Sequence, residues 1–173
     1  VTTFMVLYAV FATWLHRYTQ ESDLVIGSIV AGRRRRELED MMGYCVNTVA
    51  LRSAFSDELT GQELLNEVRR VVVEAYDHQE LPFEEVIEAL SLQRERSLSP
   101  LFNVMMVWED DPLSTFIVKD LEVAHLAWEP TASEFDLVFM VVRKVDGLDL
   151  ALLHDSTIFE DSTIDRMLEQ LEN

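Results

Sequence analysis

The chain has 173 residues, of which 49% are hydrophobic and 27% charged, a balance that suits one compact domain and excludes a disordered chain. Its formal net charge of −18 argues strongly against a nucleic-acid partner, because binding phosphates requires a basic face. The single cysteine, Cys45, excludes a disulfide framework and a thiolate metal site, and a reducing cytoplasm is the expected location. Because the chain opens with Val1 and shows no leader, we expect it to be part of a longer polypeptide.

The first third of the chain predicts one helix followed by two apolar runs. A helix capped by Thr2 or Thr3 should run to about Tyr18, with apolar residues on both faces, so we expect it between a sheet and other helices. Its stretch of about a dozen apolar residues is too short to cross a bilayer, and no membrane partner is expected. Residues 24–30 form a short β-branched run that predicts a strand, and residues 44–51 form a second apolar run.

The one dense basic run, Arg33 to Arg36, lies between these two segments and is followed directly by Glu37, Glu39 and Asp40. Two interpretations stay open. The run is a solvated loop paired with its acidic neighbours, or it is a contact for an acidic partner.

The middle of the chain predicts two helices. Residues 60–78, starting at Thr60, carry apolar residues at helical spacing with charged residues mostly on the other side. A shorter helix, residues 83–90, should start at Pro82, with acidic residues near its positive end.

The last third predicts strands and a closing helix. Asp146-Gly147 is a strong hairpin signal between two of the strands. The order of elements indicates an α/β fold with a mixed sheet. The predicted strands are residues 101–108, 116–126, 135–143 and 148–154, and the predicted helix is residues 160–172.

No residue pattern for a common catalytic or metal centre is present. The four histidines show no metal-ligand spacing, and there is no phosphate-binding glycine loop, dinucleotide fingerprint or nucleophile elbow. His154 and Asp155 are adjacent in a predicted strand, so their side chains should point to opposite faces and cannot act together.

Three segments nevertheless carry a family signature. They are residues 42–52 (MGYCVNTVALR), residues 78–85 (HQELPFEE) and residues 94–104 (RERSLSPLFNV). In this order and at these spacings they resemble the last three blocks of the condensation domains of nonribosomal peptide synthetases. The resemblance covers essentially the whole chain.

The resemblance implies a fold like that of chloramphenicol acetyltransferase, which has two similar lobes with a tunnel between them. Residues 1–173 should form the C-terminal lobe alone, with a mixed β-sheet flanked by helices. The catalytic motif of the family, HHxxxDG, belongs to the N-terminal lobe and is absent here. The only Asp-Gly pair, Asp146-Gly147, is preceded by Val141-Val142 where the motif has two histidines, and valine cannot accept a proton.

The resemblance also implies a reaction and partners. Donor and acceptor peptidyl carrier proteins would present thioester-bound substrates on phosphopantetheine arms, and the acceptor amine would attack the donor thioester to form an amide. The expected partners are the N-terminal condensation lobe, both carrier proteins and an adjacent adenylation domain, with no cofactor bound directly. The isolated lobe should be inactive. The alternatives are a non-catalytic module that docks a carrier protein, or a lobe of an epimerisation or heterocyclisation domain.

Two residues are candidates for the tunnel wall on the strength of this resemblance. Asn47 could hold a thioester or pantetheine group by hydrogen bonds, or it could tie neighbouring strands through its amide. Ser28 could contact the acceptor amine, or its hydroxyl could be satisfied by the backbone.

The remaining family positions are expected to be structural. Arg33 and Arg52 should form ion pairs. Pro82 and Phe83 should anchor a helix start, and Pro100 and Phe102 should position the next strand. Part of residues 108–134 is expected to be mobile or displaced, because in the family this stretch reaches the other lobe.

Overall fold

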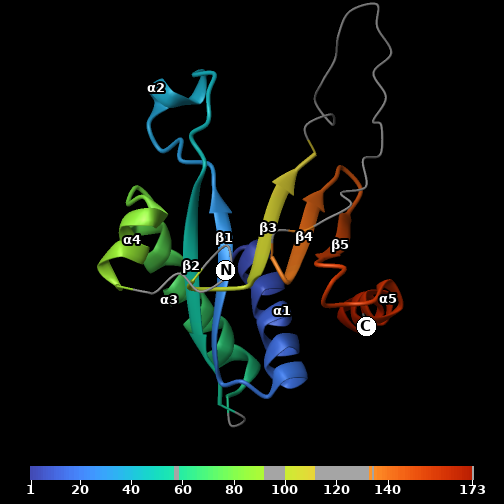
Figure 1. Ribbon diagram of the computed structural model, residues 1–173. Coiled ribbons are helices and arrows are strands. Elements are labelled where there is room, and N and C mark those ends of the chain that lie inside the picture. Colours follow the sequence, from blue (N-terminus) through green and yellow to red (C-terminus); the bar gives the residue numbers. More distant parts are fainter. Residues whose placement is uncertain (57–58, 92–99, 112–132, 134, 173) are drawn as a thin grey trace, which may run out of the picture.

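The computed structural model describes residues 1–56, 59–91, 100–111, 133 and 135–172 (Figure 1). The predicted strand at residues 116–126 and most of the stretch 108–134 lie outside the described residues, so both predictions stay open.

A five-stranded mixed sheet forms the centre of the molecule, and its strand order is β2-β1-β3-β4-β5. The pairs β1/β2 and β4/β5 are antiparallel, whereas β1/β3 and β3/β4 are parallel. The sheet confirms the predicted α/β class. The strands are β1 (Asp23–Val30), β2 (Asn47–Ala54), β3 (Val104–Asp110), β4 (Leu137–Arg143) and β5 (Leu148–His154).

Three long helices pack against one face of this sheet and share a single hydrophobic core with it (Figure 1). They are α1 (Thr3–Thr19), α3 (Gly61–Asp77) and α5 (Asp161–Glu172). The short helix α4 (Phe83–Ala89) lies beside β2. The helix α2 (Arg36–Glu39) belongs to the excursion that connects β1 to β2 and stands beyond the ends of these strands. In the described part of the chain, no helix is long and apolar enough to cross a membrane.

The helix starts follow the capping signals in the sequence. The Thr2 hydroxyl accepts a hydrogen bond from the Met5 amide at 3.3 Å and caps α1. Thr60 and Glu63 form a reciprocal capping box at the start of α3. The expectation that both faces of α1 are covered was only partly right, because seven of its 17 residues are buried while Val6 and Val10 remain exposed.

Tyr8 joins α1 to the sheet through a fully buried hydroxyl. It donates to the Leu51 carbonyl at 3.0 Å and lies 3.0 Å from the Ser53 hydroxyl. Burial raises the pKa of Tyr8 to about 12, since the phenolate would lose its hydration. The hydroxyl is therefore a neutral, satisfied part of the core.

A smaller hydrophobic cluster covers the opposite side of the sheet, around Phe102, Met105, Val107 and Val138. The Phe102 ring lies directly on Gly27 of β1, where a Cβ atom would come within 2.2 Å of the ring. Glycine at this position is what lets the ring approach the strand.

The Asp146-Gly147 hairpin is confirmed, with the Lys144 amide donating to the Gly147 carbonyl at 2.9 Å between β4 and β5. The second apolar run, residues 44–51, overlaps β2 only from Asn47 onward, and residues 44–46 belong to the excursion that carries α2. The four-residue helix α2 has no apolar periodicity that could have predicted it.

Candidate functional site

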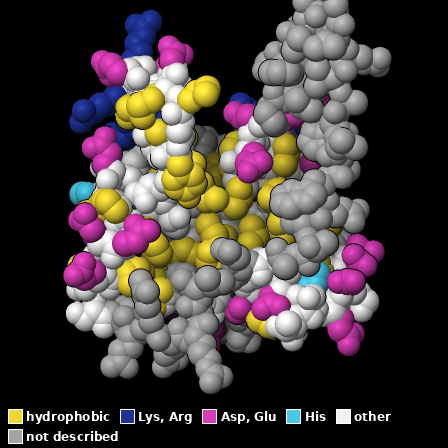
Figure 2. Space-filling model, turned by 45° about the horizontal axis from the view of Figure 1, so that its top comes forward, with side chains coloured by type: hydrophobic (Ala, Val, Ile, Leu, Met, Phe, Trp, Pro, Cys, Tyr) yellow, Lys and Arg dark blue, Asp and Glu magenta, His cyan; other side chains and the backbone are white. Residues whose placement is uncertain are grey.

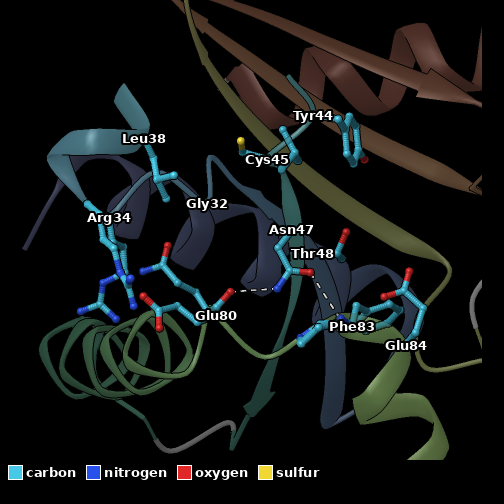
Figure 3. Close-up of a pocket in the computed structure, with 14 residues that line it drawn as sticks. Gly32, Arg34, Leu38, Tyr44, Cys45, Asn47, Thr48, Glu80, Phe83 and Glu84 are labelled. Carbon is cyan, nitrogen blue, oxygen red and sulfur yellow. Dashed lines mark hydrogen bonds between the residues drawn. The ribbon is translucent and has the colours of Figure 1, made fainter. Parts of the chain in front are cut away.

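A cavity of about 550 Å³ lies where the excursion between β1 and β2 meets the turn between α3 and α4 (Figure 3). We call residues 31–46 the arm. Leu38, Tyr44 and Cys45 line the cavity from the arm, whereas Glu80, Phe83 and Glu84 line the other side. The lining residues are Gly32, Arg34, Arg35, Leu38, Tyr44, Cys45, Val46, Asn47, Thr48, Gln79, Glu80, Pro82, Phe83 and Glu84.

Asn47, the first residue of β2, holds the turn between α3 and α4 in place. Its amide nitrogen donates to the Gln79 carbonyl at 2.8 Å and to the Leu81 carbonyl at 2.7 Å. Its amide oxygen accepts from the Phe83 backbone amide at 3.3 Å, at the start of α4. Both amide protons and one oxygen lone pair are therefore used within the chain. The ties reach from the strand to a turn rather than to neighbouring strands.

The three segments that carry the sequence resemblance meet through these contacts. Asn47 links the first segment to the second, and the Phe83 ring packs against Phe102 of the third with centroids 5.4 Å apart. Phe135 also stacks on Phe102, with ring centroids 5.7 Å apart. Pro82 is the N-cap residue of α4 and lines the cavity, whereas Phe102 is buried away from it.

The arm has a defined internal structure. Gly32 adopts a positive φ of 64°, and a Cβ atom there would lie 1.8 Å from the Cys45 carbonyl oxygen, so the two ends of the arm meet at a position that requires glycine. The Arg33 guanidinium donates to the carbonyls of Met41 at 2.6 Å and Gly43 at 3.1 Å, and also to that of Leu38. Arg33 therefore closes the arm from inside.

This arrangement corrects the expectation of an ion pair for Arg33, whose partners are backbone carbonyls. Arg52 does form an ion pair, with its Nη2 atom 2.6 Å from Asp23. The hydrogen bonds from Arg52 hold the pKa of Asp23 below its usual value. Both side chains are exposed, and neither lines the cavity.

Ser28 is buried on the helix-covered side of the sheet, where its hydroxyl donates to the Met106 carbonyl of β3 at 2.9 Å. It does not line the cavity. The structure thus brings Asn47, Pro82 and Phe83 together at the cavity and leaves Ser28, Arg52, Pro100 and Phe102 outside it.

None of the described histidines, His16, His78 and His154, lines the cavity, although His78 directly precedes the lining residue Gln79. The His16 Nδ1 atom is 2.6 Å from the Glu21 carbonyl oxygen, and its ring stacks on Phe55. His154 Nε2 lies 3.2 Å from an Asp161 carboxylate oxygen. Within the described ranges, no cluster of three His, Cys, Asp or Glu side chains could hold a metal ion.

Charged groups of both signs line the cavity. Arg34 and Arg35 come from the arm, and Glu80 and Glu84 come from the turn and from α4. All four residues belong to the solvent-accessible part of the molecule. Sequence reasoning did not single out Glu80 or Glu84 as site residues, although both lie in the second family segment, close to Pro82.

Comparison with known proteins gives a consistent result. The sequence model described as "Condensation domain" matches residues 1–173. A linear gramicidin synthase chain from Brevibacillus parabrevis is 41% identical over 168 residues, which cover 96% of this chain and 2% of that protein. Gramicidin S synthase 2 of Brevibacillus brevis is 32% identical over 166 residues, 96% of this chain and 4% of that protein. The chain thus spans a small fraction of these relatives.

Two solved structures share the fold. A four domain nonribosomal peptide synthetase bound to AMP and glycine superposes with a TM-score of 0.90 at 24% identity, over 99% of this chain and 14% of that one. The X-domain from teicoplanin biosynthesis, in its complex with OxyB, gives a TM-score of 0.84 at 26% identity, over 99% of this chain and 38% of that one.

Proposed function

Because the chain belongs to the condensation-domain family of nonribosomal peptide synthetases, we propose that it supplies the C-terminal lobe of a domain that joins two carrier-bound substrates through an amide bond. The family itself is consistent with peptide-bond formation. The lobe assignment, the partners and the inactivity of the lobe alone are our proposals.

The observation that carries this proposal is the use of Asn47 as a framework residue. Its amide is spent on holding the turn between α3 and α4, so it shapes one wall of the cavity without handling protons. The described part of the cavity wall contains no histidine. A lobe that provides a wall and leaves proton transfer to the HHxxxDG motif of the other lobe fits this arrangement.

In the proposed reaction, the acceptor amine attacks the carbonyl carbon of the donor thioester. A C–N bond forms, the C–S bond breaks, the amine nitrogen loses a proton, and the pantetheine thiol is released. The phosphopantetheine arms would belong to the donor and acceptor carrier proteins, so this chain would need no cofactor of its own. An adjacent adenylation domain and a cytoplasmic location complete the proposal.

The experiment is reconstitution. Two loaded carrier proteins are mixed with this chain alone, with the matching upstream lobe alone, and with both, and amide product is followed by mass spectrometry. Product is expected only when both lobes are present. If the complete domain gives no product, or if this chain alone gives it, the proposal is wrong.

A docking role without chemistry is the second candidate. One relative of the same fold, the X-domain, was solved in complex with another protein, OxyB, and the arm of this chain exposes large apolar side chains. In that case the complete domain would bind a carrier protein but form no product. A lobe of an epimerisation or heterocyclisation domain would instead show itself by a change in donor chirality or by a ring in the product.

A further inference from the structure

Phe83 is an apolar residue of the cavity wall that the chain holds at two points. Its backbone amide donates to the Asn47 side-chain oxygen at 3.3 Å, and its ring packs against the Phe102 ring with centroids 5.4 Å apart. One contact fixes the main chain and the other fixes the ring, while Phe83 also lines the cavity (Figure 3). Apart from Pro82, the other apolar lining residues belong to the arm.

The position of the Phe102 ring is in turn set by the sheet. The residue is buried, and its ring lies on Gly27 of β1, where a Cβ atom would come within 2.2 Å of it. Phe135 also stacks on this ring. Because protein interiors are closely packed, the Phe102 ring cannot move away from Gly27 without displacing an aromatic neighbour. A contact in the middle of the sheet is thereby linked to a residue of the cavity wall.

From these contacts we infer that Phe83 is an apolar contact for the carrier-bound substrate, and that Phe102 is the positioning residue that sets where this contact lies. The inference rests on the proposed function, because it assigns residue roles within the same reaction. Phe83 touches an aliphatic stretch of the substrate, either its acyl side chain or its pantetheine arm. Phe102 acts only through Phe83, since it is buried and does not line the cavity.

The surroundings of Phe83 explain why its ring matters for an aliphatic ligand. Charged side chains of both signs line the same cavity, namely Arg34, Arg35, Glu80 and Glu84. An aliphatic chain gains nothing from these charges and is stabilised only where it meets apolar surface. Figure 2 shows hydrophobic side chains gathered beside the arm on this side of the molecule. The ring of Phe83 therefore supplies a kind of contact that the charged lining residues cannot.

The two points that hold Phe83 have separate roles. Asn47 fixes the backbone at the start of α4, whereas Phe102 fixes the orientation of the Phe83 ring. Binding to a side chain that is already held costs less conformational entropy than binding to one that must first be ordered. Loss of the Phe102 ring should therefore weaken substrate binding although every residue that lines the cavity is still present.

The test uses the complete condensation domain that contains this chain, with loaded donor and acceptor carrier proteins. KM and kcat are measured for the wild type and for single variants. Phe83→Ala removes the contact, Phe102→Leu removes its support, and Gly27→Ala displaces the Phe102 ring with a Cβ atom. Phe139→Leu is the matched control, because it makes the same substitution at a buried phenylalanine on the helix-covered side of the sheet.

Phe83→Ala should raise KM about tenfold with little change in kcat, because an apolar wall contact stabilises the bound substrate and the transition state equally. Phe102→Leu and Gly27→Ala should each raise KM by about threefold, since Phe83 is still present but displaced. Phe139→Leu should leave KM unchanged at a comparable loss of stability, which urea denaturation measures. An equal rise of KM in Phe139→Leu and Phe102→Leu would show a general structural effect and overturn the positioning role.

The double variant Gly27→Ala/Phe102→Leu separates positioning from loosening of the fold. The smaller leucine side chain makes room for the added Cβ atom, so the KM of the double variant should lie closer to that of the wild type than the KM of Gly27→Ala does. This compensation is expected only if the effect of Gly27→Ala passes through the ring of Phe102. If the two changes instead raise KM independently, so that their effects multiply, the positioning role is wrong.

The outcomes separate this inference from the proposed function. If the wild type forms amide product and Phe83→Ala has the same KM, the inference is overturned and the proposed function stands. A complete wild-type domain that forms no product overturns both. A donor thioester of N-acetylcysteamine, which lacks most of the pantetheine arm, distinguishes the two sources of the aliphatic stretch. If the effect of Phe83→Ala persists with this donor, the acyl side chain makes the contact, and if it disappears, the pantetheine arm does.

Discussion

On the helix-covered side of the sheet, buried hydroxyls are satisfied by the chain itself, as with the Tyr8 hydroxyl between Leu51 and Ser53. The arm is built in the opposite way. It uses one arginine, Arg33, to hold its shape and leaves other charged and apolar side chains exposed. The side chains of one region stabilise the fold through buried contacts, whereas several side chains of the other are exposed.

The largest loss of stability should come from a substitution in the hydrophobic core. Phe11 is fully buried on α1 and stacks on Phe139 of β4 with centroids 4.8 Å apart. Phe11→Ala should lower the free energy of unfolding by about 3–5 kcal/mol, because it removes buried surface and leaves a cavity. The matched change in the arm, Met42→Ala, should leave stability unchanged. Urea denaturation of both variants checks this, and equal losses would abolish the contrast between the two regions.

The next effect concerns the buried hydroxyl of Tyr8. Tyr8→Phe removes its hydrogen bonds to the Leu51 carbonyl and Ser53 and should cost about 1–3 kcal/mol near pH 7. The pKa of Tyr8 is raised to about 12 in the folded chain, so its stabilising contribution is complete below the unfolded value of about 10 and is lost as the pH rises towards about 12.

Denaturation at about pH 7 and about pH 11 tests this sign. The wild type should lose more stability on alkalinisation than Tyr8→Phe, whereas the arm control Tyr44→Phe should behave like the wild type. Burial raises the pKa of Tyr76 as well, so part of the alkaline loss should remain in every variant. If the wild type and Tyr8→Phe lost the same stability between the two pH values, the alkaline loss could not be attributed to the Tyr8 hydroxyl.

The smallest effect on the free energy of unfolding should come from Asn47, which lies at the boundary between the arm and the sheet. Asn47→Ala removes three hydrogen bonds to the turn between α3 and α4 and should cost about 1–2 kcal/mol, since the site is half-buried. Hydrogen exchange should rise in α4 and in residues 79–83 but not in α1. The neighbouring change Thr48→Ala serves as the control. Uniform exchange throughout the chain would show that Asn47 supports the whole fold rather than this turn.

Local signals in the sequence predicted most of the individual elements. Thr60 with Glu63 marked the start of α3, and Asp146-Gly147 marked the hairpin between β4 and β5. These signals work because the interacting residues are close in sequence. The parallel pairing of β1 with β3 has no such signal, and a mixed sheet of this kind was expected from the order of elements and the family resemblance.

The candidate site was only partly predictable, because its contacts join residues that are far apart in the sequence or involve backbone carbonyls. Asn47 was singled out, but its partners Gln79, Leu81 and Phe83 lie more than thirty positions away along the chain. The role of Arg33 depends on carbonyls within the arm, and carbonyls carry no residue signature. The sequence shows which polar side chains are present, but only the folded chain shows which of them already form hydrogen bonds within the chain.

The hydrogen bond from Ser28 to the Met106 carbonyl also bears on how the chain folds. It joins β1 to β3 across 78 positions, so the middle of the sheet cannot close until α3 and α4 have been synthesised. The order of events on the ribosome is thereby constrained. β2 can pair with β1 early, whereas the hairpin of β4 and β5 can join this pair only through β3, which lies between β1 and β4.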